Sequence, residues 1–455
     1  MSHDPSPQEK PSLGSTKPVL SGRLSPNYKW AVVGMLWFIC FFNYADRQSI
    51  SSVVPVIQDE FGFTDFQMGM IGSAFMYVYA FGSPAAGYIG DRFRRKDLIL
   101  GGCLFWSVVT AMTGWCSRLG HFLTVRALEG FGETFYFPAS LSLVSDYHDR
   151  RTRSRALAFH QSSVYIGTIG GGWLGAWFAE KFGWRSGFYF FGISGLVLAL
   201  ALYGFLREPE RGEADMAAGD ALPEPPLPLA MVAPTIFRSP VALMLMIAFL
   251  CANFVATIFL FWTPKFLRDK FGFDLIEAGL KATLYIQLAS AVSGPLSGFV
   301  SDWLSRRFRG GRVLVQAFGV FAGAGFVVML ATTETLGTLF VAMSIFGFCK
   351  GIYDANIFAS LYDVIEPRAR ASATGLMNMV GWAGGALGPM WVGWLSENGP
   401  RATINENRSL AFASGGALYV FCGALLIATA IVLVRTSRGP LGGDLKAEAF
   451  PSDEP

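Results

Sequence analysis

An aspartate and an arginine stand side by side in an apolar segment near the start of the chain. The segment reads WAVVGMLWFIC from Trp30 and continues as FFNYADRQSI, where Asp46 precedes Arg47. A charge at the centre of a lipid bilayer costs at least about 2.5–3.5 kcal/mol on insertion scales. Charged side chains in such a segment are expected to face other helices or a polar pathway and to serve a function.

A second charged group lies in the segment FLTVRALEGFGETFYFPASL. Arg126 and Glu133 are seven residues apart, so on one helix they lie within about 20° of the same face. Glu129 lies about 40–60° from both. This segment is expected to cross in the opposite direction to the first one, which puts Asp46 and Arg47 at a depth between Arg126 and Glu133. The sequence therefore predicts that the charged residues of the two segments converge.

The residue types indicate which chemistry this cluster could perform. Arginine keeps its proton, and its planar guanidinium fits a carboxylate or a phosphate, so Arg47 and Arg126 are candidates for binding an anion. A carboxylate in a low-dielectric site gains a proton more readily, and a neighbouring arginine opposes this. Asp46, Glu133 and Glu129 are therefore candidates for coupling transport to protons. A static network of ion pairs that only orients helices would use the same residues.

Polar residues in later segments extend the candidate substrate site. Lys350 and Asp354 are four residues apart in FGFCKGIYDANIF, so they can pair on one helix face. Lys350 then either completes an anion clamp or simply neutralises Asp354. Gln161, Asn356 and Asn378 are candidates for lining the same site.

The composition indicates the elements that must position these residues. The chain has 455 residues, of which 52% are hydrophobic and 15% charged, whereas a soluble globular protein carries about 25% charged residues. The net charge of +3 gives no support for nucleic-acid binding. Segments of about 20 apolar residues predict twelve membrane spans. They begin near Lys29, Gln67, Leu98, Phe122, Ser154, Trp184, Val241, Glu277, Val313, Leu336, Ser372 and Leu410.

Basic residues indicate how the spans are oriented. Lys and Arg gather in the connections after even-numbered spans, in residues 92–96, 150–155, 306–312 and 368–370. The opposite connections, such as IQDEFGFTD and ATTETLG, are poor in them. Because basic loops stay in the cytoplasm, both termini are predicted to be cytoplasmic. We expect an integral protein of the bacterial inner (plasma) membrane.

The spans divide into two groups of six around a polar stretch rich in Pro, Ala and Glu. We expect a disordered cytoplasmic tail at residues 1–28, a first half at 29–206 and a cytoplasmic linker at 207–240. The second half is expected at 241–435, followed by a disordered cytoplasmic tail at 436–455.

The two halves contain an internal repeat. GYIGDRFRRK, from Gly87, matches GFVSDWLSRR, from Gly298, at an offset of 211 residues. SDYHDRRTRSRALA, from Ser145, matches YDVIEPRARASATG, from Tyr362, at an offset of 217. Parallel repeats of this kind predict a substrate site at the interface of the halves.

The doubled loop resembles the signature G-x-x-x-D-x-x-x-R-[RK] of the major facilitator superfamily. The resemblance covers residues 29–435 and implies an all-α membrane protein, with twelve transmembrane helices in two pseudo-symmetric six-helix halves. Arg94 departs from the family, which usually has Gly there, and this puts the local loop geometry in doubt. In the family the loop helps to latch one conformation. The matching residues are Gly87, Asp91, Arg92, Arg95, Asp302 and Arg306.

Two branches of the superfamily resemble this chain more closely. NYADRQ is similar to the N-Y-x-D-R motif of the anion:cation symporters and the spinster-like transporters, and RALEGFGETFYFPA is similar to their R-x-x-x-G-x-G-E pattern. In the symporters the first arginine contacts a substrate carboxylate, and the Asp and Glu handle protons. The resemblance implies these roles for Arg47, Asp46, Arg126 and Glu133. Tyr44, within the motif, and Tyr79, in a segment similar to the second symporter span, are further candidates for contacting substrate.

Two glycine-rich runs lie within predicted spans, GTIGGGWLG from Gly167 and GGALGP from Gly384. No strand precedes the first run, so a nucleotide-binding loop is a poor interpretation. Small residues at such spacing let helices approach closely. We expect both runs to pack helices together.

These observations predict a secondary active transporter that works by alternating access. It would import a small organic anion, a sugar acid or another carboxylate, by proton-coupled symport. We expect no cofactor and no metal, contacts with membrane lipids, no nucleic-acid partner and a monomeric state.

Three alternatives stay open from the sequence. A spinster-like proton-coupled exporter would carry lysolipid or another amphiphile, and its cavity would use Phe131, Phe135, Phe137 and Phe358. A membrane sensor that moves no solute would usually need an output domain. An enzyme is disfavoured because the chain has no HExxH motif, no GxSxG motif and no clustered metal ligands, and the lack of a phosphate loop gives no support for ATP-driven transport.

Overall fold

The computed structural model describes residues 27–90, 92–149, 151–211, 213–218, 234, 236–366 and 369–436, which are mostly helical. The first group of helices is α1 (Tyr28–Phe61), α2 (Asp65–Gly90), α3 (Arg95–Thr113), α4 (Leu119–Thr134), α5 (Tyr136–Tyr147), α6 (Arg153–Phe182) and α7 (Trp184–Phe205). The second group is α10 (Pro240–Phe271), α11 (Leu275–Arg307), α12 (Gly311–Thr332), α13 (Leu336–Tyr362), α14 (Arg370–Asn398) and α15 (Ile404–Thr436). The short helix α8 (Glu213–Ala218) lies between the groups.

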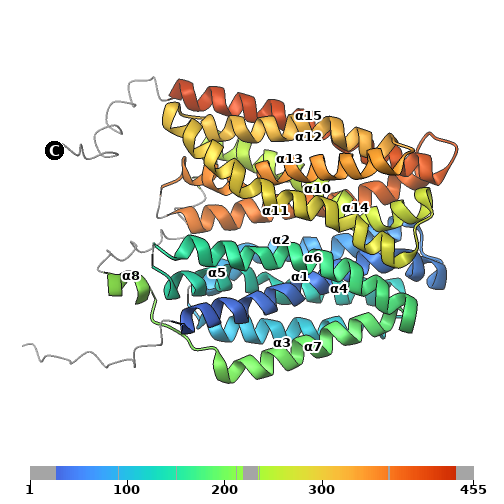
Figure 1. The fold of residues 1–455 in the computed structure, drawn as a ribbon, viewed down its shortest axis with the longest axis horizontal. Coiled ribbons are helices and arrows are strands. Elements are labelled where there is room, and N and C mark those ends of the chain that lie inside the picture. Colours follow the sequence, from blue (N-terminus) through green and yellow to red (C-terminus); the bar gives the residue numbers. More distant parts are fainter. Residues whose placement is uncertain are drawn as a thin grey trace, which may run out of the picture.

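The two groups form two halves that lie side by side (Figure 1). Counting α4 and α5 as one crossing, the described residues contain the twelve predicted spans, and the all-α membrane fold is confirmed. Helix α1 begins and α15 ends at the same end of the bundle, which we call the terminal end. The opposite end carries the connections 62–64, 272–274 and 399–403, and we call it the loop end. Residues 1–26 and 437–455 of the predicted tails, and half of the predicted linker, lie outside the described residues.

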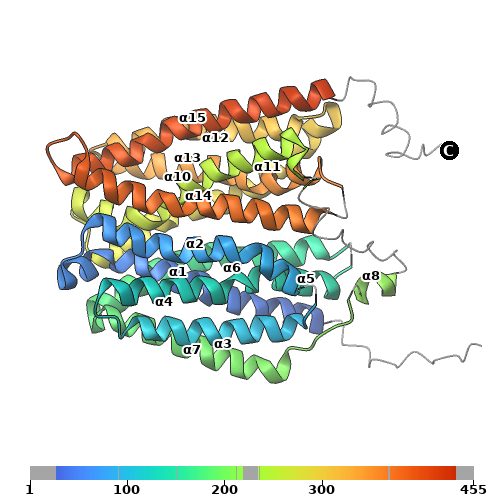
Figure 2. The same cartoon turned by 180° about the vertical axis from the view of Figure 1, so that it is seen from behind.

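The apolar character of the helices differs with their place in the bundle. Six are long and apolar enough to cross a membrane by length and composition: α3, α7, α10, α12, α13 and α15. Of these, α3, α7, α12 and α15 lie at the two outer edges of the bundle (Figures 1 and 2). Four helices that do not meet this criterion pack across the interface, α2 against α14 and α6 against α11. Polar and small residues are thus kept where other helices cover them.

The fourth predicted span is a broken helix and not one continuous helix. Helix α4 ends at Thr134, and α5 begins at Tyr136 and contains Pro138. Proline has no N–H, and its ring clashes with the carbonyl four residues earlier, which here belongs to Thr134. The break therefore lies at Phe135, two residues after Glu133.

The internal repeat is visible in matching contacts. Arg153 donates to the carbonyl oxygens of Ser145 and His148, at 3.1 and 3.0 Å. Arg370 donates to those of Tyr362 and Ile365, at 2.9 and 3.4 Å. Each residue of the second set lies 217 positions after its counterpart in the first. The same loop is therefore built twice.

The glycine runs pack helices together, as predicted. Along α6, a Cβ at Gly167, Gly171 or Gly175 would come within 2.7, 2.1 or 2.2 Å of an atom of α1. In the second run, a Cβ at Gly388 of α14 would lie 2.6 Å from the carbonyl oxygen of Phe254 on α10. Only glycine allows these backbones to approach so closely.

Gly171→Ala should destabilise the fold by forcing α1 and α6 apart, because the new Cβ would lie 2.1 Å from the Ala45 carbonyl oxygen. Overpacking of this kind costs about 1–3 kcal/mol. Thermal unfolding in detergent should therefore show a lower Tm. Gly101→Ala on α3 is the matched control, since no atom lies within 4 Å of a Cβ there. Equal Tm values for the two variants would contradict this packing.

Candidate functional site

Five charged residues from α1 and α4 meet inside the first half, as the sequence predicted. We call Asp46, Arg47, Arg126, Glu129 and Glu133 the central cluster. All but Arg47 are at most 2% exposed, and the Arg47 side chain is 13% exposed. Charges this well covered by protein must be paired with one another to be tolerated.

Arg47 joins α1 to α4. Its Nε donates to Glu133 Oε2 over 3.1 Å, and its Nη2 donates to the same oxygen. Nη2 also donates to Asn43 Oδ1 at 3.5 Å. Asp46 accepts from the backbone N–H of Arg47 at 2.7 Å and from the Thr110 hydroxyl at 3.2 Å. The two adjacent charged residues therefore have different partners.

Four aromatic rings surround the Arg47 guanidinium. Its Cζ lies 4.7 Å from the ring centroid of Tyr44, 4.5 Å from Phe75 and 5.2 Å from Tyr79. The fourth ring, that of Trp382 at 5.6 Å, comes from α14 in the other half. Aromatic faces attract a cation, especially where water is scarce. The two predicted tyrosines thus lie directly at the predicted anion-binding arginine.

The cluster has an uneven number of charges. Arg126 pairs with Glu129 at 2.5 Å, and carboxylate oxygens of Asp46, Glu129 and Glu133 lie within 4.8 Å of one another. Three carboxylates and two guanidiniums leave one negative charge when all are ionised, and one bound proton would neutralise it. These acids are also the one group in the described residues that could hold a metal ion. A metal would compete with Arg47 and Arg126 for the same oxygens.

Some hydrogen-bonding atoms of the cluster are not used. Arg47 Nη1, Arg126 Nε and Glu133 Oε1 are buried and have no partner among the described residues. A buried polar atom without a partner costs about 1–3 kcal/mol. The cluster therefore keeps free capacity to donate to an anion and to accept or hold a proton.

Two glycines bring α4 to its neighbours. A Cβ at Gly130 would lie 2.4 Å from the Phe75 carbonyl oxygen of α2, and one at Gly132 would lie 2.6 Å from the Phe105 ring of α3. The R-x-x-x-G-x-G-E pattern thus has a packing role. It places Arg126 and Glu133 against α2 and α3.

The other polar candidates lie on α6, α13 and α14. Lys350 Nζ and Asp354 Oδ2 pair at 2.5 Å on α13, as their spacing predicted. Asn356 is fully buried and donates to Ser297 of α11 at 3.2 Å, so it holds two helices together. Gln161 and Asn378 are half-buried on α6 and α14.

The predicted latch residues lie at the terminal end. Asp91 lies outside the described residues, Gly87 lies in α2, and Arg92 and Arg306 are exposed. Arg95 pairs with Asp146 of α5. In the second half, Asp302 pairs with Arg312 at 2.9 Å, and Arg312 also reaches Asp363 at 3.1 Å. Each of these ion pairs joins residues of one half.

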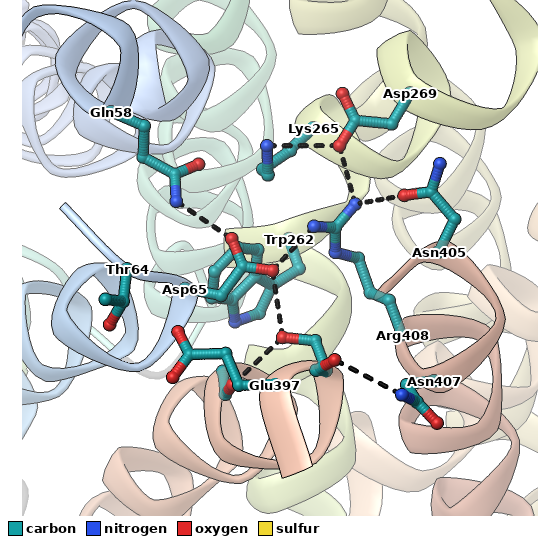
Figure 3. Close-up of polar contacts among 12 residues, drawn as sticks. Gln58, Thr64, Asp65, Trp262, Lys265, Asp269, Glu397, Asn405, Asn407 and Arg408 are labelled. Atoms are coloured by element: carbon teal, nitrogen blue, oxygen red, sulfur yellow. Dashed lines mark hydrogen bonds and ion pairs between the residues drawn. The ribbon is translucent and has the colours of Figure 1, made fainter. Parts of the chain in front are cut away.

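A polar network at the loop end was not predicted from the sequence (Figure 3). Asp65 at the start of α2 pairs with Arg408 of α15 at 2.6 Å, and Arg408 also pairs with Asp269 of α10 at 2.6 Å. Asp65 and Arg408 are 7% and 2% exposed. Arg408 lies close to the predicted start of the last span, so the rule that singled out Arg47 could have found it.

Comparison with known proteins gives a family and several relatives. The model of the Major Facilitator Superfamily matches residues 36–389. The "Probable L-galactonate transporter" of Escherichia coli is 26% identical over 428 residues, which cover 90% of each chain. A "Probable galactarate/D-glucarate transporter" of Bacillus subtilis is 28% identical over 431 residues, 88% of this chain and 91% of that one.

A solved structure shows the same fold. It is a bacterial homologue of the human lysosomal transporter Spinster, in an inward-facing and unoccupied conformation. The TM-score is 0.73 at 22% identity, covering 94% of this chain and 100% of that chain. This structural similarity supports the arrangement of the helices in two halves.

Arg126→Met should destabilise the protein more than the double variant Arg126→Met, Glu129→Gln. The single change leaves Glu129 buried without its partner, and breaking a buried pair in this way costs about 3–5 kcal/mol. The double change removes both charges. Thermal unfolding in detergent should therefore give a higher Tm for the double variant. A double variant no more stable than Arg126→Met would show that the pair does not govern stability here.

Proposed function

We propose that this chain, which belongs to the Major Facilitator Superfamily and is therefore a membrane transporter, imports a small organic anion together with protons. The observation that carries this proposal is the Arg47–Glu133 pair inside a cluster with one surplus negative charge. An anion site and a proton site share the same arginine there.

The coupling follows from competition for Arg47. A substrate carboxylate bound to the guanidinium draws Arg47 away from Glu133. The freed Glu133 carboxylate, in a site with little water, then binds a proton more readily. Asp46 and Glu129 lie close enough to share this proton. Substrate and proton therefore favour each other's binding, as symport requires.

Alternating access supplies the transport step. The two halves rock against each other so that the site faces one side and then the other, and ligands shift the balance between the states. We assign the terminal end to the cytoplasm, because the basic connections lie there. The loop end then faces the exterior of the inner membrane, from which the anion enters.

We assign a sugar acid with one carboxylate as the substrate class. The named relatives include proteins described as transporters of galactonate, galactarate and glucarate. Arg47 offers one anion site beside aromatic rings, whereas Lys350 and Asp354 in the opposite half neutralise each other at 2.5 Å. Tyr165 of α6 lies within electrostatic range of both. Because the Lys350–Asp354 pair has no net charge, it is better suited to bind hydroxyl groups of the substrate than a second substrate carboxylate.

Glu133→Gln tests the coupling. In proteoliposomes with an inward proton gradient, wild type should accumulate an aldonate, whereas the variant should lose gradient-driven accumulation and keep counterflow exchange. The neutral amide cannot exchange a proton but can still accept from Arg47. Glu60→Gln, whose glutamate pairs with Arg185 at the loop end, is the control. Unchanged accumulation in Glu133→Gln would overturn the coupling role.

The same assay separates the alternatives. A lysophospholipid is included beside the sugar acids. If only the lipid moves, the spinster-like function replaces the symport proposal, and the absence of any flux under any gradient would favour the sensor.

Asp354→Asn tests the substrate charge. The change leaves Lys350 as an unpaired cation, so an aldarate with two carboxylates should compete at least about tenfold better than before, a gain of about 1.4 kcal/mol. An aldonate should change little. Glu277→Gln breaks another pair of the same spacing, with Lys281 on α11, and serves as the control. No change in the aldarate-to-aldonate ratio would refute the assignment of Lys350 and Asp354.

A further inference from the structure

The halves are joined by hydrogen bonds toward the loop end. Among the described residues, Ser396 and Arg408 donate to Asp65, and the N–H of Phe66 donates to Glu397. Deeper in the bundle, Gln48 donates to the Leu260 carbonyl oxygen and Ser73 to that of Ala386. All five bonds lie in the part of the bundle nearer the loop end. This end is closed in the structure.

Arg408 is shared between the two halves. Its Nη2 donates to Asp65 of α2 in the first half, and its Nη1 donates to Asp269 of α10 in its own half, both at 2.6 Å. Nη1 also donates to Asn405 at 3.0 Å, and the Cζ lies 5.7 Å from the Trp262 ring. Figure 3 shows the guanidinium between the two aspartates.

Asp65 and Arg408 can each keep a contact within their own half when the two halves separate. Arg408 retains Asp269, which is on its own half and also pairs with Lys265 at 3.1 Å. Asp65 retains Gln58 of its own half, which donates to it at 2.8 Å. A buried charge left with no partner would cost several kcal/mol. Separation therefore breaks one charge pair without leaving either residue unsupported.

We propose that Asp65 and Arg408 form the gate at the loop end, and that Asp269 holds Arg408 when the gate is open. The closed state is stabilised by the pair across the halves. The open state is stabilised by Asp269, because Asp269 is then the only carboxylate on Arg408. One arginine thus sets the balance between the two states through two aspartates.

The gate differs from the central cluster in its response to pH. Burial raises the pKa of Asp65, but the Arg408 guanidinium opposes this and holds the pKa below its ordinary value. A carboxylate with a lowered pKa stabilises the folded protein fully at any pH above its ordinary pKa of about 3.9. This stabilisation is lost only when the pH falls through the lowered pKa. The other charged groups around the same cavity are Asp59 from α1, Lys265 and Asp269 from α10, and Glu397 from α14. The gate should therefore be insensitive to pH between 5 and 8.

Distance measurements between spin labels test the gate without any substrate. Gly120→Cys and Gly337→Cys place the labels at matching positions of α4 and α13, 217 residues apart, at the loop end. Both glycines are exposed and have no atom within 4 Å of a Cβ. The six native cysteines are buried and should remain unlabelled.

Asp65→Asn and Asp269→Asn should move the distance distribution in opposite directions. Asp65→Asn weakens only the closed state. The population with a long distance between the two labels, which reports the open gate, should therefore rise about tenfold relative to wild type. Asp269→Asn weakens the open state more than the closed one, so that population should fall. Asp65→Glu keeps the charge and should restore much of the closed population.

Asp59→Asn is the matched control, since Asp59 is an exposed aspartate at the edge of the same cavity. Equal shifts of the same sign in Asp65→Asn and Asp269→Asn would show that the network is a structural support and not a gate. No shift in either variant would also overturn the proposal. The readout needs no transport, so it can fail independently of the proposed symport.

Discussion

A guanidinium held away from water needs a carboxylate beside it, and this constraint shapes both polar regions of the protein. Arg47 has Glu133 in the first half, and Arg408 has Asp65 and Asp269 at the loop end. In both places an arginine links segments that are far apart in the sequence. Because arginine does not titrate in practice, its partners decide what each site does. Competition for the cation can then couple binding, protonation and movement.

Close contact between helix backbones makes these pairs possible. Gly130 lets α4 lie against α2, and Gly171 lets α6 lie against α1. Each contact brings a polar helix under the cover of others, while apolar helices such as α7, α12 and α15 lie at the outer edges. The glycines cost conformational entropy and offer no side chain of their own. What they provide is the short distance over which the charges pair.

The sequence predicted the central cluster better than the loop end for a physical reason. Asp46, Arg47 and Glu133 stand within apolar segments, and a seven-residue spacing places charges on one helix face, so local rules were sufficient. The Asp65–Arg408 pair joins residues 343 positions apart, which only the docking of the halves determines. Asn356 shows the same limit, because its burial against α11 depends on which neighbour its helix face meets. The break between α4 and α5, by contrast, follows from a local property of Pro138.

Helices α2 and α14 connect the gate with the central cluster, because each carries a residue of the gate network and a ring that contacts Arg47. Helix α2 carries Asp65 at its start and Phe75 and Tyr79 further along, and α14 carries Ser396 near its end and Trp382 opposite Tyr79, with ring centroids 5.3 Å apart. Trp382 is the one ring around Arg47 that comes from the other half. If α14 moves away from α2 when Asp65 releases Arg408, Trp382 leaves Arg47 and one side of the guanidinium becomes open to an anion. Opening the gate and uncovering the binding arginine would then be one rigid movement, and no separate signal between the two sites is required.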